Sequence, residues 1–132
     1  LYPLLKHKQE FLFEAAQSLS KTGQYEKANE YLERAVLLSS DPMLYYVMAK
    51  NEQCLGEYRQ AEKHLLHAID ILPERIYPYY LLMNLYTEPS YFQPAKLKMA
   101  IDSVLTKKPK VESSAIKEMK EKARSMLNNT SI

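Results

Sequence analysis

Residues 23–28, Gly-Gln-Tyr-Glu-Lys-Ala, return 33 positions later as residues 56–61, Gly-Glu-Tyr-Arg-Gln-Ala, and this repetition decides the fold of the chain. The same offset joins further apolar residues: Leu12 with Tyr45, Ala16 with Ala49, Leu32 with Leu65, and Ala35 with Ala68. A period of this length is typical of stacked helical units, because one unit cannot bury its apolar face alone. Such arrays expose extended binding surfaces, so the period favours binding over catalysis.

A third, weaker copy follows the second at an offset of 34 residues. The matched pairs are Tyr45 with Tyr79, Tyr58 with Phe92, Ala61 with Ala95, and Leu65 with Met99. The turn inside this copy, residues 88–95, contains Pro89 and Pro94 and is one residue longer than the cognate turn. Small residues belong where two packed helices approach each other, so we expect Ala28, Ala61 and Ala95 at close helix contacts.

Apolar residues recur at helical spacing along the chain, and no segment alternates with a period of two. Gly23 and Gly56 are expected to end helices, because glycine adopts the left-handed conformation at little cost. Asp41 and Pro42 are expected to start one, as cap and first helical residue. The predicted helices cover residues 5–21, 24–38, 42–55, 58–71, 75–87, 94–106 and 113–127.

The predicted fold class is therefore all-α, an α-solenoid of three helical hairpins and a C-terminal capping helix. The hairpins cover about residues 9–41, 42–74 and 75–109, and the capping helix about residues 113–127, within a single domain of residues 1–132. Three repeats are close to the minimum for a stable array. An apolar content of 46% and only 2 glycines argue against a disordered chain.

The second copy resembles the tetratricopeptide repeat residue by residue. The matching positions are Tyr45, Met48, Ala49, Gly56, Tyr58, Ala61, Leu65, Ala68 and Pro73. Glu52 departs from the pattern, which usually has Tyr there, and the third copy has Ser90 at the turn glycine. The resemblance covers about residues 9 to 109 and implies a right-handed solenoid whose concave face is lined by the first helix of each hairpin.

Stepping by the repeat places one aromatic residue at the same point of each first helix: Phe13, Tyr46 and Tyr80. One turn later come Gln17, Lys50 and Asn84, and three residues before the aromatics come Glu10, Met43 and Tyr77. Residues three and four apart share a helix face, so these rows form one stripe. Aromatic anchors beside hydrogen-bonding groups are typical of binding hot spots.

The stripe predicts a ligand groove for a protein or peptide, lined by Phe13, Gln17, Met43, Tyr46, Lys50, Tyr77, Tyr80 and Asn84. The alternative is that individual aromatic residues only pack between repeats. Members of the family that dock chaperones clamp a peptide carboxylate with basic residues in these rows. Aromatic residues stand there in this chain, so a carboxylate clamp is not expected.

Motifs that carry chemistry are scarce. The sequence has no glycine-rich phosphate loop, no nucleophile elbow and a single cysteine, Cys54, so we expect no catalytic residue and no cofactor. His64 and His67 have helical spacing, but zinc sites use three or four ligands, so no metal site is expected. The prediction is a domain that is not an enzyme.

Charge is placed unevenly. Residues 1–95 carry a net charge of −3 and residues 96–132 one of +5. The simpler interpretation is a solvated basic end, and the sharper one is contact with an anionic membrane surface or a glycan. The lysines of residues 107–110 lack interleaved aromatic residues, so we expect no nucleic-acid partner.

Residues 73–82 and 107–119 resemble the tail of Bacteroides-type O-antigen ligase or polymerase-like membrane proteins. This resemblance implies the soluble part of a larger bacterial inner-membrane protein, with this domain in the periplasm and the glycan-transfer chemistry elsewhere. The start at Leu1 rather than Met agrees with an excised or processed chain. The alternative function that follows is direct binding of a glycan or lipid-linked sugar in the tyrosine-rich groove.

Overall fold

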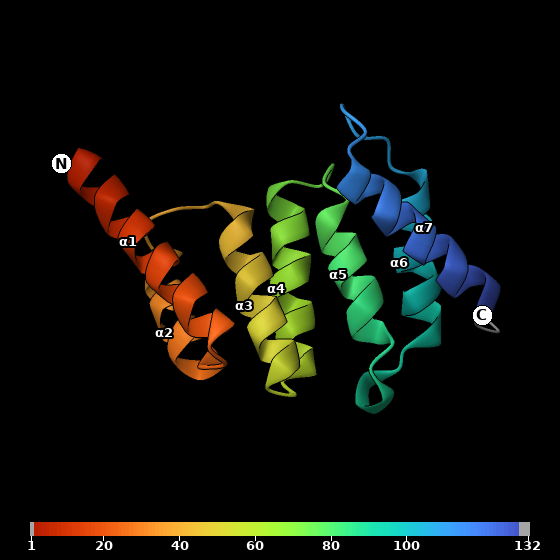
Figure 1. The fold of residues 1–132 in the computed structure, drawn as a ribbon, viewed down its shortest axis with the longest axis horizontal. Coiled ribbons are helices and arrows are strands. Elements are labelled where there is room, and N and C mark those ends of the chain that lie inside the picture. Colours follow the sequence, from red (N-terminus) through yellow and green to blue (C-terminus); the bar gives the residue numbers. More distant parts are fainter. Residues whose placement is uncertain (1, 130–132) are drawn as a thin grey trace. The chain divides into compact units, whose positions relative to one another are not determined.

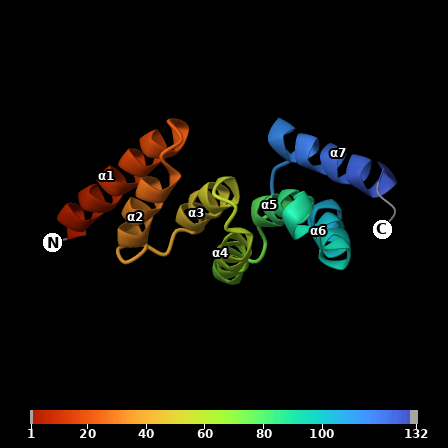
Figure 2. The same cartoon turned by 90° about the horizontal axis from the view of Figure 1, so that it is seen from below.

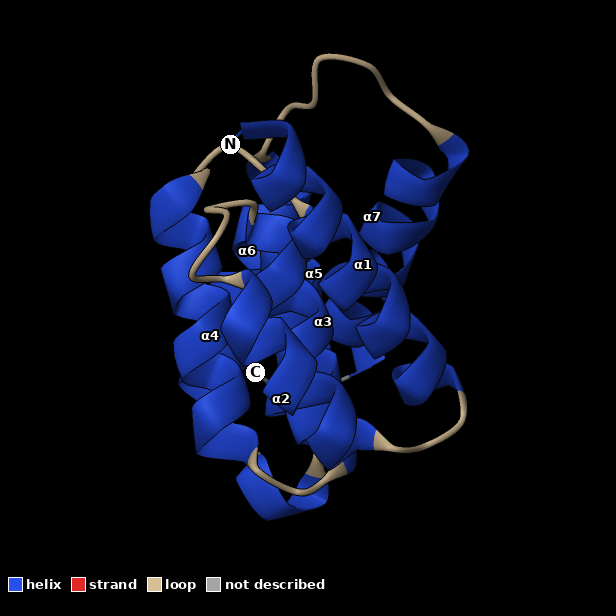
Figure 3. Ribbon diagram, turned by 90° about the vertical axis from the view of Figure 1, so that its left-hand side faces the viewer, coloured by secondary structure: helices blue, strands red, loops and turns tan. Residues whose placement is uncertain are grey.

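The computed structural model describes residues 2–129, and all its regular elements there are helices (Figure 3). They are α1 Tyr2–Lys21, α2 Tyr25–Ala35, α3 Pro42–Cys54, α4 Tyr58–Ile71, α5 Tyr77–Tyr86, the 3-10 helix η1 Pro89–Tyr91, α6 Pro94–Thr106 and α7 Ser114–Asn129. The predicted all-α class, with three hairpins and a terminal helix, is confirmed. None of the helices described is both long and apolar enough to span a bilayer.

The helices group into two compact units (Figures 1 and 2). Residues 1–71 contain the hairpins α1–α2 and α3–α4, and residues 72–132 contain the hairpin α5–α6 with α7. The single domain expected from the sequence stays a prediction.

The first unit has a core of aliphatic residues and alanines. Its cluster of buried residues consists of Leu12, Ala16, Ala28, Leu32, Ala35, Leu44 and Met48. Ala28 and Ala61 are 0% and 1% exposed, as predicted for residues at close helix contacts. Helices α1, α2 and α3 therefore share one core, and the alanines permit their close approach.

Both hairpins of the first unit turn on a glycine. Gly23 and Gly56 have φ angles of 82° and 78°, in the left-handed region. After α3, Gly56 N–H donates to Gln53 O at 3.1 Å and Glu57 N–H to Glu52 O at 2.8 Å, the paired bonds of a Schellman motif. The predicted role of the two glycines is confirmed.

The start of α3 also follows the prediction. The carboxylate Oδ1 of Asp41 accepts a hydrogen bond from Met43 N–H at 3.0 Å, and Pro42 stands in the first turn. This cap satisfies one of the N–H groups that lack a partner inside the helix. Helix α3 carries the second aromatic residue of the predicted stripe, Tyr46.

The register predicted for the third hairpin is wrong in its second helix. Helix α6 begins at Pro94, 36 residues after Tyr58, because the turn through η1 is longer than the sequence match assumed. Ala95 and Met99, expected inside, are exposed, and Leu97 is 0% exposed at the place of Ala61. The same shift places Ile101 opposite Leu65 in the repeat and Val104 opposite Ala68, and both are fully buried.

Helix α7 packs on α6 through an apolar face and one buried lysine. Ala123 is fully buried, and the other apolar residues predicted for this face are half-buried: Ile116, Met119, Met126 and Leu127. Lys120 Nζ donates to the carbonyl oxygens of Val104, Leu105 and Lys107 at 3.0, 3.2 and 2.9 Å. A cation at the last carbonyls of a helix satisfies them and complements the helix dipole.

Candidate ligand-binding surface

The stripe predicted from the sequence starts in the first unit, on α1 and α3. Gln17 and Lys50 are exposed, and Met43 is 45% exposed. Phe13 is half-buried and packs against the core cluster of this unit. Tyr46 is only 5% exposed, so its ring belongs to the packed interior. The polar and methionine positions of this part are therefore the accessible ones.

In the second unit the stripe lies on α5 and is more open. Tyr77, Tyr80 and Asn84 are all half-buried. The rings of Tyr77 and Tyr80 stack with centroids 6.4 Å apart and an interplanar angle of 23°. Lys122 Nζ of α7 lies 5.5 Å from the Tyr80 ring centroid, a cation–π contact. Helix α7 thus adds a positive charge to this surface. The stripe predicted from the sequence did not include that residue.

Asn84, one turn after Tyr80 on α5, has a side-chain oxygen atom without a hydrogen-bond partner in the described residues. This atom, Oδ1, is buried. An unpaired buried acceptor costs about 1–3 kcal/mol. Because this atom is buried, a ligand could pair with it only if the Asn84 side chain turned outward. Its assignment, like that of the whole stripe, stays a prediction.

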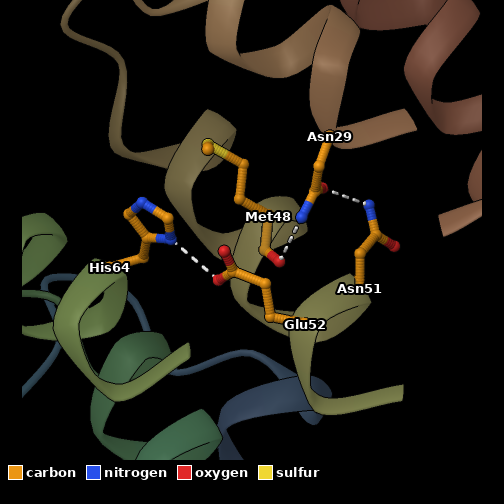
Figure 4. A network of polar contacts seen from close by, with 5 residues as sticks. All are labelled: Asn29, Met48, Asn51, Glu52 and His64. Carbon is orange, nitrogen blue, oxygen red and sulfur yellow. Dashed lines mark hydrogen bonds and ion pairs between the residues drawn. The ribbon is translucent and has the colours of Figure 1, made fainter. Parts of the chain in front are cut away.

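A buried polar network in the first unit links α2 to α3 (Figure 4). Asn29 Nδ2 donates to the carbonyl oxygen of Met48 at 3.3 Å, and Asn51 Nδ2 donates to Asn29 Oδ1 at 2.8 Å. Asn29 and Asn51 are 8% and 2% exposed. Buried amides that satisfy one another fix one arrangement of the helices that carry them.

The same helix α3 is joined to α4 by a carboxylate and an imidazole. Glu52 Oε1 lies 2.7 Å from His64 Nδ1, and Glu52 is 5% exposed (Figure 4). The Tyr45 ring contacts both His64 and His67, with centroids 5.8 and 4.6 Å apart. The pair explains why Glu replaces the usual Tyr of the repeat at position 52: His64, twelve residues later, supplies its partner.

Sequence reasoning did not find this network. A usable signal was present, because Asn29 and Glu62 occupy equivalent positions in two hairpins and both are buried polar residues. A polar residue that recurs on a core face predicts an internal hydrogen bond. The repeat period is carried by apolar positions, and a pair of buried polar residues leaves that period unchanged.

The side chains that could bind a metal ion are dispersed over the described residues. No three His, Cys, Asp or Glu side chains within residues 2–129 come together to hold a metal ion. Cys54 is exposed at the end of α3 and hydrogen-bonds Tyr25, which raises the pKa of the Tyr25 hydroxyl. Cys54 is the last residue of α3, just before the turn at Gly56.

The family model of the tetratricopeptide repeat matches residues 9–42, which contain the part of α1 from residue 9 onward and all of α2. No curated protein matches the chain. The O-antigen ligase or polymerase-like parent therefore has no support beyond the sequence resemblance.

Solved structures match over most of the chain. The type III secretion translocator chaperone SycD of Yersinia enterocolitica superposes with a TM-score of 0.80 at 15% identity, covering 92% of this chain and 89% of that chain. SycD in complex with a peptide of the translocator YopD gives 0.78 at 16% identity, with 90% and 88% covered. The first tetratricopeptide domain of Spaghetti (RPAP3), bound to the HSP90 peptide SRMEEVD, gives 0.71 at 18%, with 93% and 95% covered. The chain thus folds into helical hairpins of the tetratricopeptide type.

Proposed function

We propose that this chain is a non-enzymatic interaction module that binds a peptide segment of a partner protein. The observation that carries the proposal is the likeness, over 90% or more of the chain, to two solved structures that hold a bound peptide. A shared fold alone does not fix a ligand, so the proposal also needs a suitable surface on this chain.

That surface is the stripe on the first helices, and its most accessible aromatic part lies on α5. Tyr77 and Tyr80 present a stacked pair of amphipathic rings, and the half-buried Asn84 lies one turn beyond Tyr80. Tyrosine supplies large contact area with little loss of side-chain entropy, which suits it to an interface. Lys122 beside Tyr80 favours a ligand with a carboxylate or a carbonyl at that point.

The finer functions suggested by the sequence have less support. Direct binding of a glycan rests on the tyrosine rings alone, whereas two of the similar solved structures hold peptides. Contact of the basic end with a membrane or glycan is weakened by Lys120, which is buried, and by Lys107, whose Nζ lies 4.9 Å from the Tyr79 ring centroid. The proposal therefore stands without a ligase-like parent.

The test begins with a displayed library of random peptides selected on the whole chain. The affinity of a selected peptide is then measured by fluorescence anisotropy for the parent and for Tyr80→Ala. We expect the dissociation constant to rise at least about 30-fold, as for a hot-spot aromatic residue. Tyr80→Phe should retain most of the affinity, because the ring is kept.

Phe92→Ala is the matched control, since Phe92 is a 50% exposed aromatic residue of the same unit outside the stripe. Its affinity should equal that of the parent. Thermal melts of all variants separate lost binding from lost folding. An equal loss in both variants, or no loss in Tyr80→Ala, would place the peptide elsewhere. Failure to select any peptide, with binding of purified surface oligosaccharide instead, would favour the glycan alternative.

A further inference from the structure

Helix α1 carries an apolar stripe that nothing in the described chain covers. Leu4 and Phe11 are 71% and 66% exposed, although both are large apolar residues. They are seven residues apart, so they lie on the same face of the helix. Helix α1 has 20 residues against 11 in α2, and its first turns extend past the end of α2 (Figure 1). The stripe is therefore accessible over about two turns.

The repeat shows what this face does in the next hairpin. The equivalents of Phe11 and Ala15, 33 residues later, are Leu44 and Met48, which are 1% and 2% exposed. Leu44 and Met48 belong to the core cluster that includes Ala28, Leu32 and Ala35 of α2. In the second hairpin this face is thus the one packed on a neighbouring helix. On α1 the equivalent face is apolar too, but no described helix packs against it at Phe11.

The charges of α1 are arranged for a helix that runs in the opposite direction. Lys8 and Glu14 lie three residues on either side of Phe11, on the same face of the helix, and both are exposed. An antiparallel copy of α1 centred on Phe11 would set Lys8 of each helix opposite Glu14 of the other.

Among the described residues, α1 is the one helix that carries two large exposed apolar side chains. The other exposed ones lie one to an element or loop: Leu37, Met43, Leu66, Leu72, Phe92, Met99 and Val111. The exposed residues of α7 are charged, polar or small. The best match for the stripe on a second copy is therefore its own α1. Such an isologous contact closes at two subunits.

We propose that the exposed face of α1, centred on Phe11, is a homodimer interface in which α1 of one copy packs antiparallel against α1 of a second copy. The stripe supplies the apolar contact, and the charges on either side of Phe11 set the direction. The ligand stripe takes Phe13 and Gln17 from the same helix, and helical spacing places both on another face than Leu4 and Phe11.

The test measures the mass of the whole chain by sedimentation equilibrium over a range of concentrations. The parent should dimerise, and Phe11→Gln should raise the dimer dissociation constant at least about 30-fold, as for a central aromatic residue. Met99→Gln is the matched control, because Met99 is 70% exposed on α6, and it should dimerise like the parent. Far-ultraviolet circular dichroism confirms that each variant keeps its helices.

Charge reversal tests the antiparallel direction. The single variants K8E and E14K should each weaken the dimer, because each sets like charges opposite each other across the interface. The double variant K8E/E14K restores the opposite charges, so it should dimerise again, with the same loss at high salt as the parent. A monomeric parent at high concentration, a dimer indifferent to Phe11→Gln, or a double variant that stays monomeric would each overturn the proposal.

Discussion

The hairpins of the first unit and the hairpin of the second solve the same packing problem with side chains of different size. At three equivalent buried positions the first unit has alanine and the second a larger residue: Ala16 and Ala49 against Met83, Ala28 and Ala61 against Leu97, and Ala35 and Ala68 against Val104. The distance between packed helices depends on the side chains at their contact. We therefore expect α5 and α6 to lie farther apart than α1 and α2.

The turns inside the hairpins also differ between the two units. Gly23 and Gly56 allow a tight reversal after α1 and α3, whereas the third hairpin has no glycine and reverses through η1. The comparison teaches that alanine contacts and glycine turns belong together in this chain. Where the short turn is absent, extra residues separate the helices and larger side chains fill the space.

The largest effect is expected from Leu97→Ala. Leu97 is fully buried in α6, and the hairpin around it lacks the close approach that suits alanine. The free energy of unfolding should fall by about 2–5 kcal/mol, measured by urea denaturation. A change below about 0.5 kcal/mol would show that the third hairpin does not need the larger residue. Ala95→Leu, at an exposed position of the same helix, is the control and should be nearly neutral.

The opposite change, alanine to leucine, is made at Ala61 of the first unit. Ala61→Leu should lower the free energy of unfolding by less than Leu97→Ala does. Ala61 is 1% exposed in α4, at the position predicted for a close helix contact, so the added atoms should force the packed helices apart. We expect a loss of about 1–3 kcal/mol in the free energy of unfolding. A melting temperature equal to that of the parent would contradict the packing difference between the two regions.

The smallest effect concerns the turns. A Cβ atom at Gly56 would meet no heavy atom within 4 Å, so only the left-handed backbone opposes a side chain there. Gly56→Ala should therefore lower the free energy of unfolding by about 1–2 kcal/mol. Ser90→Ala in η1 is the matched control and should change little. Equal effects at both positions would mean that the two kinds of turn do not differ in backbone demand.

Much of the fold could be predicted because the repeat signal and the helix periodicity agree. All seven predicted α-helices exist, and the cap at Asp41 and the glycine turns stand where the sequence placed them. The register of α6 was missed for a physical reason. Its helix start is set by the length of an irregular turn, whereas Phe92 and Ala95 matched the family pattern by residue type alone.

The candidate site was less accessible to sequence reasoning. A helix face can be read from periodicity, but how deeply each residue is buried depends on what packs against it, which is why Tyr46 is 5% exposed and Tyr80 half-buried at equivalent positions. Two further contacts each join residues from different helices: the cation–π contact of Lys122 with Tyr80, and the pair formed by His64 and Glu52. Such pairs leave no mark in the repeat period.

The most direct test of the account is a map of where a selected peptide binds on the whole chain. Nuclear magnetic resonance of the isotopically labelled protein, titrated with that peptide, reports every affected amide. The account predicts shifts along the first helices, including the side-chain amides of Gln17 and Asn84 and the backbone amide of Lys50. Shifts confined to the second helices α2, α4 and α6 would contradict it.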